Sequence, residues 1–235
     1  MSIKPILFNT EMVKAILDGR KTVTRRVLAE KVMLDKKWGL DREPYLHNGK
    51  WYYDEQTAVD DSRTIELKPK YQPGNILYVR ETWCKGSFDV EELPDGRTGE
   101  TFVEQRIGDN DYIFKEFCLR NKIWIDEVTW RPSIHMPREA ARIWLKVTNV
   151  RVERLQDITA EQARKEGVKD PYDYQDPSFY ELESMKNLEC DVAAFAGLWF
   201  LTLPKYYYDW QAWEGNPWVW VISFERCEKP EEVSH

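Results

Sequence analysis

The stretch from residue 9 to residue 26, NTEMVKAILDGRKTVTRR, decides the fold of this chain. Apolar residues within 12–17 recur at helical spacing, which predicts a short amphipathic helix with one buried face. Asn9 or Thr10 can cap the start of that helix, and Gly19 is a natural stop at its end. The chain must therefore turn sharply at Gly19, and the residues that follow are held in a fixed orientation.

The octapeptide GRKTVTRR at 19–26 contains four cationic side chains and two hydroxyls. A turn followed by a strand over 22–26 can present a lysine and a hydroxyl to a ligand. The same pattern also fits a solvated strand with basic side chains. From the spacing alone, both interpretations stay open.

Three further strands are predicted outward from this stretch. Residues 76–83 follow a Pro-Gly-Asn turn and are rich in β-forming side chains. Apolar and polar residues alternate over 141–152, which is typical of a half-buried strand. Residues 218–224 are apolar at almost every position, so that strand should be buried on both faces.

A second helix is predicted over 159–167. Thr159 and Gln162 have the spacing of a capping box, and Gly167 is the stop at the other end. Few helices among several strands indicate an α+β fold, in the form of a small mixed β-barrel flanked by short helices.

Long polar stretches separate the predicted elements, near 28–71, 85–131 and 168–215. Each contains aromatic residues, so we expect ordered insertions in one domain that spans 1–235. A chain of 235 residues is long enough to bury a sizeable core.

The charge and composition narrow the classes of partner. The formal net charge of -7 argues against coating long duplex DNA, whereas the local cations at 20–26 suit a nucleotide or a short single strand. Eleven tryptophans and twelve tyrosines exceed what a simple core needs, and a minority could stack on bases. The oligomeric state is not indicated.

Nothing in the sequence indicates a metal, a cofactor or a membrane partner. The four cysteines and three histidines are scattered, so we expect no metal site. There is no apolar run long enough for a membrane span and no apolar signal segment after Met1, so a cytoplasmic location is expected.

Taken together, these segments resemble the ASCH domain, a branch of the PUA-like β-barrel superfamily. The resemblance rests on 16–26, 72–83, 142–150, 155–159 and 218–224, about half of the chain. It implies a PUA-like barrel. Longer members of this kind are common in phages and prophages, which makes a phage-related origin an expectation.

The resemblance also implies catalytic roles. Many ASCH proteins have a glutamate at the position of Thr24. The bacterial enzymes that remove the acetyl group from N4-acetylcytidine instead have a threonine there, as this chain does. By similarity to those enzymes, Thr24 would be the nucleophile and Lys21 its general base. Glu166 would carry a proton to the leaving amine, and Arg26 or a backbone amide would hold the oxyanion.

Other residues are candidates for binding the substrate. Trp83 either stacks on a base or belongs to the core, and His135 either contacts the ligand or fixes its proline-bracketed loop. The full set of candidate binding residues is Arg20, Arg25, Arg26, Arg80, Trp83, Ser133 and His135.

The function expected from the sequence is binding of a modified nucleoside or short single-stranded RNA in a basic cleft, with amide hydrolysis of N4-acetylcytidine as the candidate reaction. Two alternatives stay open. One is a non-catalytic RNA-binding or regulatory module, and the other is a ribonuclease that cuts single-stranded RNA with Lys21 as its cationic group.

Overall fold

The computed structural model describes residues 2–28, 43–58, 61–92, 98–104, 112–123, 128–169, 188–203 and 213–231. The chain divides into two compact units. The first contains 1–19, 75–146 and 226–235, and the second contains 20–74 and 147–225. Strands β10 (Trp144–Arg154) and β11 (Trp218–Cys227) contribute residues to both.

In the first unit, three strands lie in the order β1-β6-β10. Strand β1 (Ile3–Leu7) is parallel to β6 (Ile76–Arg80), and the first residues of β10 run antiparallel to β6. Helix α1 (Thr10–Leu17) is capped by Asn9, whose side chain accepts a hydrogen bond from the Met12 amide at 2.9 Å. Gly19 follows the helix with a φ of 75°, a conformation that glycine adopts without strain.

The rest of the first unit follows β6. Strand β7 (Trp83–Glu92) pairs with β8 (Thr98–Glu104) and β9 (Tyr112–Phe114), and α3 (Lys115–Arg120) comes next. Two single 3-10 turns, at Ser133–His135 and Arg138–Ala140, lead to β10. The first of these turns holds two of the predicted site residues.

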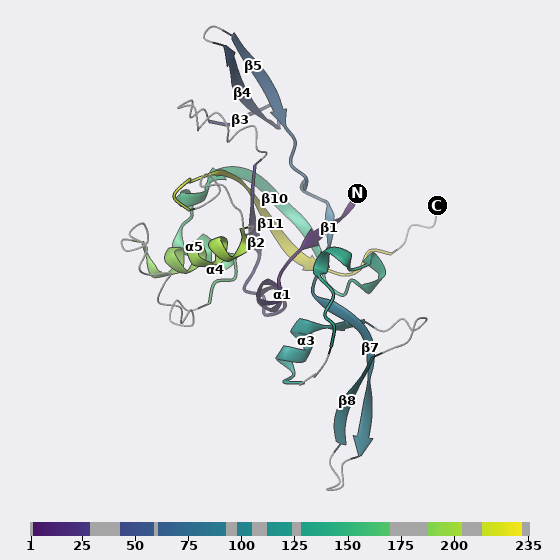
Figure 1. Cartoon of the computed structure of the whole chain (residues 1–235). Coiled ribbons are helices and arrows are strands. Elements are labelled where there is room, and N and C mark those ends of the chain that lie inside the picture. Colours follow the sequence, from purple (N-terminus) through teal and green to yellow (C-terminus); the bar gives the residue numbers. More distant parts are fainter. Residues whose placement is uncertain are drawn as a thin grey trace. The chain divides into compact units, whose positions relative to one another are not determined.

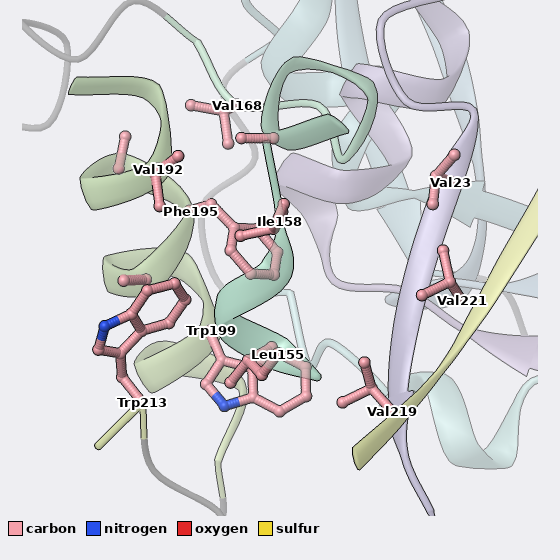
Figure 2. Packing of buried hydrophobic residues seen from close by; sticks show 13 residues of the cluster. Val23, Leu155, Ile158, Val168, Val192, Phe195, Trp199, Trp213, Val219 and Val221 are labelled. Atoms are coloured by element: carbon pink, nitrogen blue, oxygen red, sulfur yellow. The ribbon is translucent and has the colours of Figure 1, made fainter. Parts of the chain in front are cut away.

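The second unit is built on the strand order β10-β11-β2, in which β2 (Val23–Val27) is antiparallel to β11. A 3-10 turn at Leu155–Asp157 leads from β10 into α4 (Ala160–Lys165), which is followed by α5 (Cys190–Thr202). Figure 2 shows how the buried side chains of this unit pack between α5 and the β2–β11 pair. This core fixes α4 beside the start of β2.

A three-stranded antiparallel sheet also belongs to the second unit (Figure 1). It consists of β3 (Tyr45–His47), β4 (Lys50–Ala58) and β5 (Asp61–Leu67), with β4 in the middle. Asn48 and Gly49 connect β3 to β4, and both have positive φ angles, 49° and 74°. This is the two-residue hairpin turn that asparagine followed by glycine favours.

The predicted α+β class is confirmed, because the described part of the chain consists mostly of strands with a few helices. Both predicted helices form, and the capping box of Thr159 and Gln162 is present. The predicted strands form with shifted ends: the strand expected over 76–83 stops at Arg80, and β7 begins at Trp83. Among the described residues the strand order ends at β1 in the first unit and at β2 in the second, so closure into a barrel stays a prediction.

Each predicted insertion contains regular structure in part of its described residues. The sheet β3–β4–β5 falls within 28–71, β8, β9 and α3 fall within 85–131, and α5 falls within 168–215. In the described residues, no helix has both the length and the apolar character to cross a membrane.

The capping box gives a direct test of what holds α4 in place. The hydroxyl of Thr159 accepts a hydrogen bond from the Gln162 amide, so Thr159→Ala should lower the free energy of unfolding by about 1 kcal/mol. Urea denaturation measures the change. Thr159→Ser keeps the oxygen and should stay close to the wild type. An alanine variant as stable as the wild type would show that the cap contributes nothing.

Candidate functional site

Lys21 is the centre of the candidate site. It lies just before β2, with 2% of its surface exposed, and forms an isolated antiparallel bridge with Glu166. Its ammonium Nζ donates to the Val23 carbonyl at 2.9 Å, to the Glu166 carbonyl at 2.9 Å and to Glu166 Oε2 at 2.6 Å. Three acceptors match the three hydrogens of an ammonium group.

Glu166 is shared between two cations. Its Oε2 faces Lys21, and its Oε1 accepts a hydrogen bond from Arg25 Nη1 at 3.1 Å. The residue follows the last turn of α4 and is itself buried. A carboxylate between two buried cations offsets part of their desolvation cost.

Arg25 is held almost entirely by the protein. Its Nη2 donates to Gln162 Oε1 at 2.6 Å and to Glu153 Oε2 at 3.2 Å, and its guanidinium lies over the Phe195 ring. These contacts account for its burial as part of the core. A role for Arg25 in binding substrate stays a prediction.

Side chains alternate along a strand, so Thr24 and Arg26 lie on the face of β2 opposite to Arg25. Thr24 is 1% exposed, and its Oγ1 accepts a hydrogen bond from Arg26 Nη1 at 2.8 Å. Arg26 also donates to the Arg25 carbonyl at 2.9 Å. Unlike Thr24, Arg26 is only partly buried.

Burial dominates the electrostatics of this cluster. Desolvation lowers the pKa of Lys21, and the negative charge of Glu166 opposes that shift. Desolvation also lowers the pKa of Arg26, against the influence of Glu166 and Tyr71. Since Arg26 acts on Lys21 as a nearby positive charge, Lys21, Glu166, Arg26 and Thr24 form one electrostatic cluster in the second unit.

Arg20 lies at the edge of the cluster, where its Nη1 donates to the Gly167 carbonyl at 2.6 Å. An open pocket of about 650 Å³ lies next to the ion network and shares Gln162 with it. Its lining includes the hydroxyls of Thr22, Thr148 and Ser223, but not Lys21, Thr24 or Glu166.

Four of the predicted binding residues belong to the first unit. Arg80 donates through Nη1 to the Ile134 carbonyl at 3.1 Å and lies over the Tyr78 ring. Trp83 is 3% exposed and packs against Tyr112, with the Arg131 guanidinium 5.2 Å from its ring centre. Trp83 is therefore a core residue in this structure, one of the two roles that the sequence left open.

Ser133 and His135 form the 3-10 turn that Arg80 contacts. The His135 side chain is exposed and Ser133 is partly buried. Met136 next to them is fully buried and accepts a weak hydrogen bond from the Glu81 amide through its sulfur. The turn is thus anchored to the end of β6, and ligand contacts of Ser133 and His135 stay predictions.

The sequence did not predict which side chains pair in two groups of polar residues. Glu153 and Gln162 complete the surroundings of Arg25, and only the capping-box role of Gln162 was visible in the sequence. In the first unit, Arg142 donates to both Glu81 and Glu116, which are buried carboxylates. Desolvation raises the pKa of Glu81, against the opposing effect of Arg142.

Compared with models of known protein families, with curated proteins and with solved structures, the chain matches none.

Removal of the Glu166 charge tests the ion network. Glu166→Gln leaves Lys21 and Arg25 buried without their shared counter-charge, so it should lower the free energy of unfolding by roughly 3–5 kcal/mol. Glu161→Gln on the same helix is the matched control, because Glu161 pairs with Lys165 in solvent and should matter little. Thermal and urea denaturation of both variants give the comparison. Equal small effects would mean that the buried network does not hold the unit together.

Proposed function

We propose that this chain is an ASCH-type protein with a PUA-like barrel that hydrolyses the acetyl amide of N4-acetylcytidine to cytidine and acetate. The observation that carries the proposal is the 2.6 Å contact between Lys21 Nζ and Glu166 Oε2. These two residues are 145 positions apart in the sequence. They are two of the three to which the family resemblance gives catalytic roles, and the third, Thr24, is linked to them through Arg26.

The reaction begins with a proton transfer from Lys21 to Glu166 along this short contact. The neutral amine then takes up the proton of the Thr24 hydroxyl, relayed through one water because Thr24 lies on the other face of β2, as the threonine oxygen attacks the acetyl carbon. Desolvation favours the neutral amine, because it lowers the pKa of Lys21. Arg26, which is hydrogen-bonded to Thr24, is placed to stabilise the oxyanion that forms.

The bond from the acetyl carbon to N4 breaks when Glu166 returns its proton to that nitrogen, and cytidine leaves. An acetyl ester on Thr24 remains. Glu166 then takes a proton from the water that attacks the ester, Lys21 returns a proton to the Thr24 oxygen, and acetic acid leaves and ionises to acetate. Glu166 passes its proton back to Lys21, which restores the starting ion pair. Because Thr24 is buried, the Arg26 guanidinium must shift its hydrogen bond from Thr24 Oγ1 to the acetyl oxygen when the substrate enters.

A second candidate function is a binding module without catalysis. It is favoured by one observation: the three hydrogens of Lys21 are all donated to protein acceptors, which suits a permanently charged structural group. Such a module would use the cations of 20–26 to hold RNA and leave it unchanged.

Thr24→Ala separates the two functions. Loss of the nucleophile should reduce turnover of N4-acetylcytidine by roughly 10³-fold or more, measured as cytidine released over time. Thr24→Ser should keep part of the activity, and Thr22→Ala is the control for a threonine outside the cluster. Undiminished turnover by a folded Thr24→Ala protein would rule out Thr24 as the nucleophile.

The protonation of Lys21 provides an independent test. In the proposed mechanism the Lys21–Glu166 pair must hold one proton, so kcat/KM should fall as the pH rises through the pKa of Lys21, below the usual lysine value of 10.5, because desolvation lowers that pKa. Lys21→Arg keeps a positive charge beside Glu166 but cannot release its proton, so its turnover should be lost. An active arginine variant would instead assign Lys21 a purely electrostatic role.

A further inference from the structure

The sheet β3–β4–β5 of the second unit has two distinct faces. Residues directly paired across strands share a face, so Tyr45 lies beside Tyr52, and His47 lies beside Lys50. Tyr52 in turn pairs with Glu66 of β5. These side chains define what we term the aromatic face: Tyr45, His47, Lys50, Tyr52, Asp54, Thr64 and Glu66.

The opposite face of this sheet is the buried one. Tyr53 and Leu67 on that face are buried, and Trp51 makes an edge contact with Trp220, with the ring centres 6.3 Å apart. Trp220 pairs with Arg26 in the β2–β11 register, and Ile222 pairs with Thr24. Trp51 of this sheet therefore contacts the face of β2 and β11 that carries Arg26 and Thr24.

The aromatic face differs from the usual solvent face of a sheet, which is polar. Tyr45 and Tyr52 are stacked, with ring centres 5.9 Å apart and planes 29° apart, and His47 lies 6.4 Å from Tyr52. The result is a row of three rings along the sheet (Figure 1 shows its strands). Tyr45 at one end of the row is 40% exposed, and His47 at the other end is also exposed.

The polar groups of the aromatic face are already engaged by one another. Asp54 accepts hydrogen bonds from the Tyr45 hydroxyl and from Thr64, and Glu66 pairs with Lys50. Lys50 thereby partly neutralises Glu66, and the Tyr45 hydroxyl is held by Asp54. The face offers ring surface to solvent beside the exposed Lys50 side chain. Bases of a single strand stack on such surfaces irrespective of their sequence.

We propose that the aromatic face binds unpaired bases of a single-stranded RNA whose acetylated cytidine occupies the site at Thr24. The preferred substrate is then a polymer, and the free nucleoside is a minimal substrate that fills only the site at Thr24. This inference rests on the proposed function for the chemistry at Thr24. It adds a binding surface on the hairpin whose opposite face contacts β11 through Trp51 and Trp220.

Fluorescence anisotropy with a labelled oligocytidylate RNA of roughly ten nucleotides, without acetyl groups, tests the aromatic face. Tyr45→Ala should weaken binding about 5- to 150-fold, which is the loss of one stacked base. Tyr45→Phe keeps the ring and should bind like the wild type. The matched control is Leu46→Ala, since Leu46 is 58% exposed but lies on the opposite face. His47→Ala removes a different ring of the row and gives a second, independent measurement.

Turnover of free N4-acetylcytidine is measured in parallel and should be unchanged in these variants. Wild-type affinity in both Tyr45→Ala and His47→Ala overturns the inference. So does a wild-type protein that hydrolyses the nucleoside but does not bind the RNA. RNA binding that depends on Tyr45, without nucleoside turnover, supports the aromatic face and refutes the proposed hydrolysis. A dimer that Tyr45→Ala dissociates while RNA affinity is unchanged would assign the face to a second copy of the chain.

Discussion

The contact between the Lys21 ammonium and the Glu166 carboxylate is the interaction on which the second unit depends. Both groups are buried, and a buried charge without a partner of opposite charge is unfavourable. The contact requires the start of β2 and the end of α4 to lie side by side, and the hydrogen bond from the Thr22 amide to the Lys165 carbonyl runs alongside it. The strands and α5 complete the apolar core of the same unit (Figure 2).

The elements around this contact could be predicted from local sequence because their signals are local. A capping box, a glycine with positive φ and a run of apolar residues each act within a few positions. The hairpin β3–β4 also had a local signal, the asparagine and glycine at 48 and 49, which the sequence analysis did not use. The end of β6 at Arg80 had no local signal, because residues 76–83 are rich in β-forming side chains. Tertiary contacts separate this stretch into β6 and the start of β7.

The site itself was only partly predictable. Glu166 was assigned by resemblance, since no spacing rule connects residues 145 positions apart. Glu153 and Gln162 were not predicted as partners of Arg25, because an arginine can select its acceptors only once β10, α4 and β2 have been brought together. The other four candidates belong to the first unit: Arg80, Trp83, Ser133 and His135. Their described contacts are within that unit, as in the hydrogen bond from Arg80 to the Ile134 carbonyl.

The abundance of aromatic residues has two different explanations within the second unit. Phe195, Trp199 and Trp213 pack on one another in the core, as large apolar side chains usually do. Tyr45, Tyr52 and His47 form a row on the outward face of a sheet, where burial does not account for them. The first set stabilises the unit that holds Lys21, and the second gives that unit a surface suited to unpaired bases.

Trapping of the acyl intermediate tests the central claim most directly. The protein is mixed with N4-acetylcytidine, quenched with acid during the first turnover, digested and analysed by mass spectrometry. The proposed chemistry predicts one acetyl group on the peptide that contains Thr24, formed at the rate at which the first cytidine is released. Cytidine release with an unmodified Thr24 peptide, or with the acetyl group on another residue, would contradict it.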